Sequence, residues 1–147
     1  MNASSFEMDR GDYAAAAAIA GIGVAAAPGR SEVRANRSLA LGALGRREEA
    51  LADAQACVAL DPGRAFPHYA LGVAFYRLGR LDQARPAFET ALALRADGTM
   101  EPRAAFAALA ALGRRDEGCA AWRALEAAGQ GGAGLRRTAA ALGCVPP

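Results

Sequence analysis

Residues 65–98 read AFPHYALGVAFYRLGRLDQARPAFETALALRADG, and this stretch decides the fold. Apolar and alanine residues recur at helical spacing on both sides of Leu78-Gly79-Arg80. Because glycine accepts the backbone conformations of a tight turn without steric cost, we expect helices over roughly 67–78 and 82–94 with a short turn at Gly79. The stretch therefore predicts a helical hairpin.

The same turn recurs along the chain at a constant spacing. It occurs at Leu44-Gly45-Arg46, Leu78-Gly79-Arg80 and Leu112-Gly113-Arg114. Successive glycines are 34 residues apart, and one further step back leads to Gly11. A fixed period without insertions is typical of stacked helical repeats. We therefore predict one domain over 1–147, divided into a shortened repeat 1–30, the repeats 31–64, 65–98 and 99–132, and a terminal segment 133–147 with a short capping helix.

Composition supports helices and argues against several other classes of protein. The chain has 41 alanines but only 10 valine, isoleucine and threonine residues together, which favours helices over sheets. Its 17 basic residues, all arginine, face 15 acidic ones, a balance that is unlike the basic surface of a nucleic-acid-binding protein. The apolar stretches are shorter than the roughly 20 residues of a membrane helix, and the N-terminus lacks signal-peptide features. We expect a soluble, cytoplasmic protein.

The repeat resembles the tetratricopeptide repeat, a helix–turn–helix unit of 34 residues. The best-matching window is 65–98, which carries Leu71-Gly72, Phe75, Ala84, Phe88 and Ala91 at the places of the family pattern. Window 31–64 has Arg37-Ser38 in place of Leu-Gly, and window 99–132 is degenerate, with Ala105-Phe106 there. The resemblance implies an all-α, right-handed superhelical solenoid of antiparallel helix pairs, about four repeats long and closed by the terminal helix.

The resemblance also implies a function, that of a non-enzymatic scaffold that binds an extended segment of a partner protein in its concave groove. In the family, fixed places on the first helix of each repeat face this groove. Carried over to this chain, the candidate site residues are Asn36, Phe66, Tyr69, Val73, Tyr76, Arg77 and Arg103. Window 65–98 supplies the large apolar side chains, and these recur on one helical face.

One family subtype, the carboxylate clamp, binds the C-terminal tails of chaperones, and Asn36-Arg37 resembles its Asn-Arg pair. The clamp also needs two basic residues in the next repeat, where this chain has Phe66 and Ala70. It needs a lysine and an asparagine in the first repeat, where this chain has Met1 and Ser5. The sequence therefore does not predict a clamp.

Residues for catalysis or metal binding are scarce. The single histidine, His68, has no partner at ligand spacing, and its place in the repeat is one of packing. Cys57, Cys119 and Cys144 are an odd number without close spacing, so neither a disulfide framework nor a metal site is predicted, and a reducing compartment follows. We expect no enzyme activity, no cofactor and no metal.

Three alternatives remain open. The chain, with its shortened first repeat, is also consistent with a module or fragment of a larger enzyme or co-chaperone. Helical repeats of similar length bind RNA, although the apolar groove counts against this reading. The third alternative is self-association, through residues 145–147 or through an uncapped end of the solenoid.

Overall fold

The computed structural model describes residues 12–146, and these form eight α-helices, one short 3-10 helix and no strand. The helices are α2 (Tyr13–Ala26), α3 (Ser31–Ala43), α4 (Arg47–Leu60), α5 (Ala65–Arg77), α6 (Leu81–Leu94), α7 (Pro102–Ala111), α8 (Arg115–Ala127) and α9 (Ala133–Leu142), with η1 (Arg95–Asp97) after α6. The beginning of the shortened repeat predicted at 1–30, with Met1, Ser5 and Gly11, lies outside the described residues.

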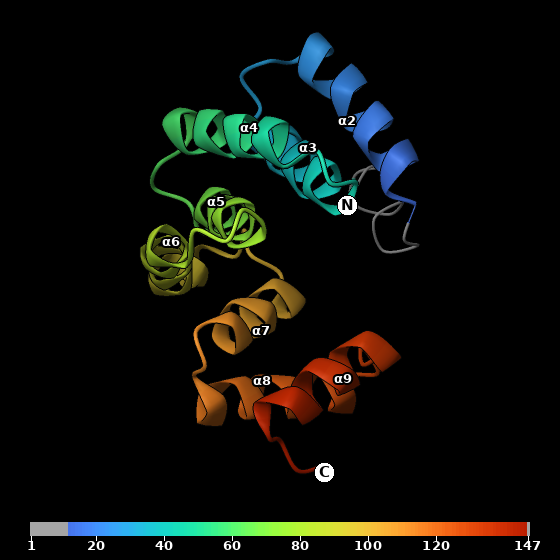
Figure 1. Ribbon diagram of the computed structural model, residues 1–147, viewed down its shortest axis with the longest axis vertical. Helices are drawn as coiled ribbons and strands as arrows, with labels where there is room; N and C mark the ends of the chain where they lie inside the picture. The colour runs from blue at the N-terminus through green and yellow to red at the C-terminus, as the bar shows by residue number, and fades with distance from the viewer. Residues whose placement is uncertain (1–11, 147) are drawn as a thin grey trace.

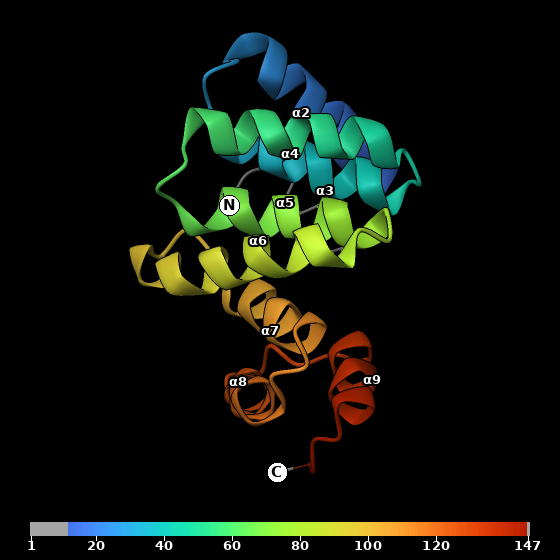
Figure 2. The same cartoon turned by 60° about the vertical axis from the view of Figure 1, so that its left-hand side comes forward.

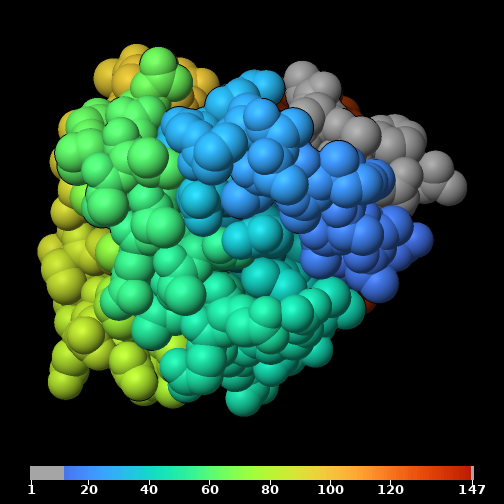
Figure 3. Space-filling view, turned by 90° about the horizontal axis from the view of Figure 1, so that it is seen from above, coloured from blue at the N-terminus to red at the C-terminus, as the bar shows by residue number. Residues whose placement is uncertain are grey.

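Consecutive helices pair and the pairs stack along the long axis of the molecule (Figures 1 and 2). The pairs are α3 with α4, α5 with α6, and α7 with α8. At the N-terminal end, α2 packs on α3, and Figure 3 shows the blue α2 lying across this end of the stack. At the other end, α9 packs on both α7 and α8. The prediction of an all-α repeat solenoid is confirmed.

Each predicted Leu-Gly-Arg turn reverses the chain through a left-handed glycine. The φ angles of Gly45, Gly79 and Gly113 are +83°, +75° and +69°. The amide of the following arginine donates to a carbonyl five residues earlier, for example Arg80 to Phe75 at 2.9 Å, and the glycine amide donates to a carbonyl three residues earlier. These two bonds satisfy backbone groups at the end of the first helix, as in a Schellman motif. The turns predicted from the sequence are confirmed.

Small residues let the two helices of a pair approach closely. A Cβ on Gly72 of α5 would lie 2.6 Å from Cδ1 of Phe88 on α6, a distance that side-chain carbons do not tolerate. Phe88 fills this space and is buried in the main core with Ala84 and Ala91. The family pattern of window 65–98 is therefore the packing pattern of the α5–α6 pair.

The preceding repeat has an ion pair between its two helices. Arg37 of α3 donates two hydrogen bonds to Asp53 of α4, at 2.5 and 2.6 Å, and only 5% of Asp53 is exposed. Hydrogen bonding to Asp53 raises the pKa of Arg37, so the guanidinium stays charged. Beside it, Ser38 Oγ donates to the carbonyl of Ala50 at 2.7 Å. Arg37 and Ser38, which depart from the family pattern, thus each have a polar partner on the facing helix α4.

No helix within residues 12–146 is long and apolar enough to cross a membrane.

The left-handed turn gives a direct test of stability. We expect Gly79→Ala to lower the free energy of unfolding by about 1–2 kcal/mol, because an L-residue at positive φ is strained. The control is Gly21→Ala in α2, where an added Cβ meets nothing within 4 Å and the backbone is helical. That change should raise stability by about 0.5–1 kcal/mol. Urea denaturation followed by circular dichroism measures both, and equal effects would contradict the role given to the turn.

Candidate peptide-binding groove

An open groove of about 380 Å³ lies where α5, α7 and α9 meet. Its lining residues are Tyr69, Val73, Tyr76, Arg77, Phe88, Ala107, Ala110, Ala111 and Thr138. The α5 side provides aromatic and branched side chains, whereas the α7 side provides only alanines. The groove is therefore a slot between large side chains on α5 and small ones on α7.

Aromatic stacking fixes the α5 wall. The ring centroids of Phe66 and Tyr69 are 6.1 Å apart with nearly parallel planes, and Tyr69 lies 6.1 Å from Phe88 in a tilted arrangement. Both rings of the first pair are half-buried against the core. Tyr76, in contrast, is 51% exposed. Because Tyr76 has little packing of its own, it is the aromatic group most available to a ligand.

The start of α5 is anchored by the segment that precedes α7. The carboxylate of Asp97 accepts the amide of Ala65 at 2.9 Å, and Thr99 Oγ accepts the amide of Phe66 at 3.2 Å. The amide of Thr99 also donates to Asp97, and this bond is the main reason that the pKa of Asp97 lies below its usual value. These bonds fix the position of the aromatic wall relative to α7.

Arg77 provides the positive charge at the groove edge. The Arg77 side chain lies against α3 of the preceding repeat. A Cβ on Gly42 of α3 would come within 2.9 Å of Arg77 Cδ. Gly42 thus leaves room for the aliphatic part of Arg77. The guanidinium itself is on an exposed residue, and no ion pair to it occurs within residues 12–146.

Thr138 brings the terminal helix into the groove, a contribution that the sequence did not indicate. Its neighbour Ala139 is buried against Phe106, Trp122 and Leu125, with Leu135 and Leu142 packed at the side. Glu126 of α8 accepts two hydrogen bonds from Arg136, at 3.0 and 3.1 Å. The helix predicted as a cap therefore also forms one wall of the groove.

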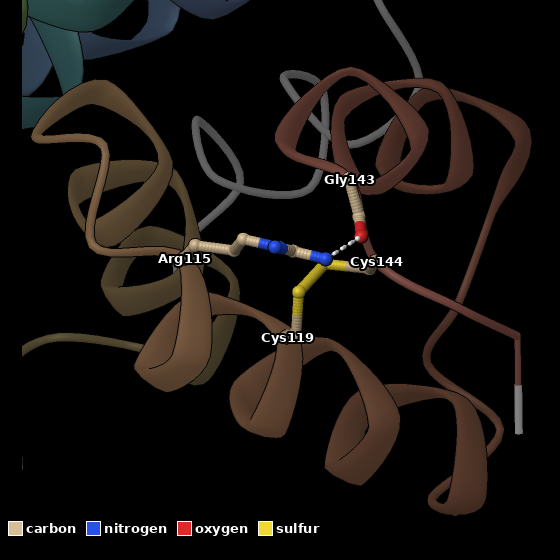
Figure 4. The surroundings of a disulfide bond; sticks show 4 residues. All are labelled: Arg115, Cys119, Gly143 and Cys144. Atoms are coloured by element: carbon tan, nitrogen blue, oxygen red, sulfur yellow. Dashed lines mark hydrogen bonds between the residues drawn. A yellow bond between two sulfur atoms is a disulfide. The ribbon is translucent and has the colours of Figure 1, made fainter.

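A disulfide between Cys119 and Cys144 ties the end of α9 to α8 (Figure 4). The sequence did not predict this disulfide. The two cysteines are 25 residues apart in the sequence, a spacing that gives no sign of a pair. They come to a Cα–Cα distance of 5.3 Å because α9 runs back along α8. Closing a loop of 25 residues restricts the unfolded chain by about 3.5 kcal/mol in the loop-entropy model. The argument for a reducing compartment loses its basis, and cytoplasmic location stays a prediction.

Comparison with known families agrees with this architecture. Models of the tetratricopeptide repeat match residues 31–64 and 65–97. The chain belongs to the tetratricopeptide repeat family. A comparison with curated protein sequences gives no significant match.

Solved structures of other tetratricopeptide repeat proteins are similar to this one. A thermophilic repeat protein of Thermus thermophilus is 27% identical with a TM-score of 0.68, covering 95% of this chain and 77% of its own. The Sgt2 repeat domain of Aspergillus fumigatus is 23% identical with a TM-score of 0.63, covering 87% and 78%. The second repeat domain of human RPAP3, solved with the HSP70 peptide SGPTIEEVD, is 26% identical with a TM-score of 0.59, covering 76% and 87%.

Of the seven predicted groove residues of this repeat protein, the structure brings together Tyr69, Val73, Tyr76 and Arg77. Phe66 lies behind them, stacked on Tyr69. Asn36 is only 5% exposed, so a ligand reaches little of its side chain. Arg103 points elsewhere, because its guanidinium donates to the carbonyl of Gln130 at 3.0 Å and it does not line the groove.

The remaining reactive residues have structural roles. The His68 ring donates from Nε2 to the carbonyl of Pro62 at 2.7 Å. Burial raises the pKa of the Cys57 thiol to about 12, and its Sγ contacts the carbonyl of Ser31 at 3.0 Å. Over residues 12–146, no three histidine, cysteine or acidic side chains gather as metal ligands would.

The environment of Tyr69 predicts its titration. Burial raises the pKa of its phenol to about 12, because ionisation would place a charge in the aromatic wall. Since the folded value is raised, the stability from neutral Tyr69 is present below about pH 10 and is lost as pH rises through 12. The difference in 295-nm absorbance between wild type and Tyr69→Phe should show one ionisation near pH 12. A midpoint at the ordinary value of a free tyrosine would show that the wall is open to water.

Proposed function

We propose that this tetratricopeptide repeat protein is a non-enzymatic scaffold that binds an extended segment of a partner protein in the groove between α5, α7 and α9. Proteins of this fold generally mediate protein–protein interactions, and a related domain is solved with a bound peptide. The observation that carries the proposal is the exposed Tyr76 beside Tyr69 and Val73, facing the alanines of α7. Exposed aromatic side chains at the edge of a groove are typical anchors for a ligand.

The groove lining specifies the chemistry of the segment. Between the aromatic wall and the alanines of α7, the slot fits an apolar or aromatic side chain or a proline ring. Arg77 at the edge supplies a donor for an acidic side chain or a backbone carbonyl. A segment with an apolar residue next to an acidic one therefore suits the groove best.

The groove gives less support to RNA as the ligand. RNA binding relies on several cations that follow the phosphates of the strand, whereas Arg77 is the one guanidinium that residues 12–146 place in this lining. The chaperone-tail function is likewise not proposed, because Phe66 and Ala70 stand where the clamp needs cations and Asn36 is buried.

A peptide-display selection on the folded protein tests the proposal. We expect enriched peptides that pair an apolar with an acidic residue, and we expect Tyr76→Ala to weaken their binding by about tenfold or more, as for an aromatic hot spot. Arg77→Gln should remove the preference for the acidic residue. Fluorescence anisotropy with a labelled peptide measures each dissociation constant.

The matched control is Tyr13→Ala, because Tyr13 is also exposed, at 37%, but lies on α2 away from the groove. It should leave binding unchanged, while circular dichroism verifies that all variants are equally helical. No enriched peptide, or equal losses for Tyr76→Ala and Tyr13→Ala, would refute this site.

A further inference from the structure

The Cys119–Cys144 disulfide is accessible from the surface. Both residues line an open hollow of about 310 Å³, together with Arg115, Asp116, Arg123, Gly143 and Val145. Cys119 is buried, whereas Cys144 is half-buried, so Cys144 is the more exposed residue of the pair. Thiol–disulfide exchange requires that an attacking thiolate can approach one sulfur. This hollow provides the approach that a crosslink inside a core would lack.

The hollow also contains groups that favour exchange. Arg115 donates from its guanidinium to the carbonyl of Gly143 at 3.0 Å (Figure 4) and lines the same hollow as the two cysteines. Among residues 12–146, Arg123 adds a second guanidinium to the lining, and Asp116 adds one carboxylate. Guanidinium groups near a disulfide stabilise both the incoming thiolate and the thiolate that leaves.

The element tied by this bond has little stability of its own. α9 has ten residues and no side-chain cap at its first turn, and Ala139 is its only buried residue. Helices this short are marginal in water without tertiary contacts. Besides the disulfide, α9 is held by the packing of Ala139 and Leu142 on α7 and α8, and by the Arg136–Glu126 pair. Just after the helix, Arg115 donates to the carbonyl of Gly143. Because 63% of the Arg136 side chain is exposed, solvent screens the ion pair and reduces its contribution to stability.

We infer that the Cys119–Cys144 pair is a reversible thiol–disulfide switch, which on reduction frees α9 from α8 and removes the Thr138 wall of the groove. The reductant is a dithiol, whose thiolate attacks Cys144 Sγ and releases the Cys119 thiolate. The second thiol of the reductant then breaks the mixed disulfide and releases Cys144. Two electrons and two protons pass to the protein, and the dithiol becomes a disulfide. The effect on ligands rests on the proposed binding function of the groove.

Trp122 reports the release of α9 without any ligand. It is the only tryptophan of the chain, is 4% exposed, and packs in the same cluster as Ala139 of α9. After reduction with dithiothreitol, we expect its emission to shift to the red and the α9 amides to exchange hydrogen about tenfold faster or more. Unchanged emission and exchange after complete reduction, verified by alkylation and mass spectrometry, would overturn the switch.

Two variants assign the effect to this pair. Cys144→Ser should show the reduced-type emission without reductant and should not respond to dithiothreitol. Cys57→Ala removes the third cysteine, which is buried and forms no disulfide. This variant should respond to dithiothreitol as the wild type does. A response that disappears in Cys57→Ala, or that persists in Cys144→Ser, would overturn the assignment.

Ligand binding is measured separately, with a peptide selected on the oxidised protein. Reduction should weaken its binding about fivefold or more, because a preformed wall is lost. If α9 is released and the peptide binds both forms equally, the link between switch and groove is overturned. If α9 is released and no selected peptide binds either form, the switch stands and the proposed binding function fails.

Discussion

The two helices of each pair can pack along their whole length because the chain reverses direction within about three residues, through a glycine at positive φ. Gly45, Gly79 and Gly113 adopt this conformation at 34-residue intervals, so each hairpin repeats the geometry of the one before it. An L-residue there would be strained, and a longer loop would shift the helices out of register. The stacking of pairs, and with it the groove, depends on this turn.

Within that frame, the repeats reach close packing in two ways. The α5–α6 pair uses Gly72 and the ring of Phe88. The α3–α4 pair uses Arg37 and a nearly buried Asp53 at positions where, one period later, the chain has Leu71 and Ala87. A buried ion pair is a weak source of net stability, but it strongly disfavours any register that separates its charges. The polar pair therefore fixes how α3 and α4 meet.

The C-terminal end depends on contacts that the repeat does not provide. α9 packs on α8 through Ala139, and Gly118 leaves space for Leu142, whose Cδ2 would lie 2.6 Å from a Cβ at that glycine. The disulfide then fixes the last residues of the helix. Because α9 also carries Thr138 into the groove, the stability of the terminal helix and the shape of the candidate site are coupled.

The sequence by itself determined the helical hairpin, its period and its turns, because glycine conformation and helical periodicity are local properties. It also indicated Tyr69, Val73, Tyr76 and Arg77, since residues on one face of α5 share a surface wherever that helix lies. Only the tertiary structure decided that Asn36 is buried, that Arg103 bonds Gln130, and that Cys119 meets Cys144. Each of these depends on how one helix lies against another, and the path of α9 back along α8 leaves no periodic signal in the chain.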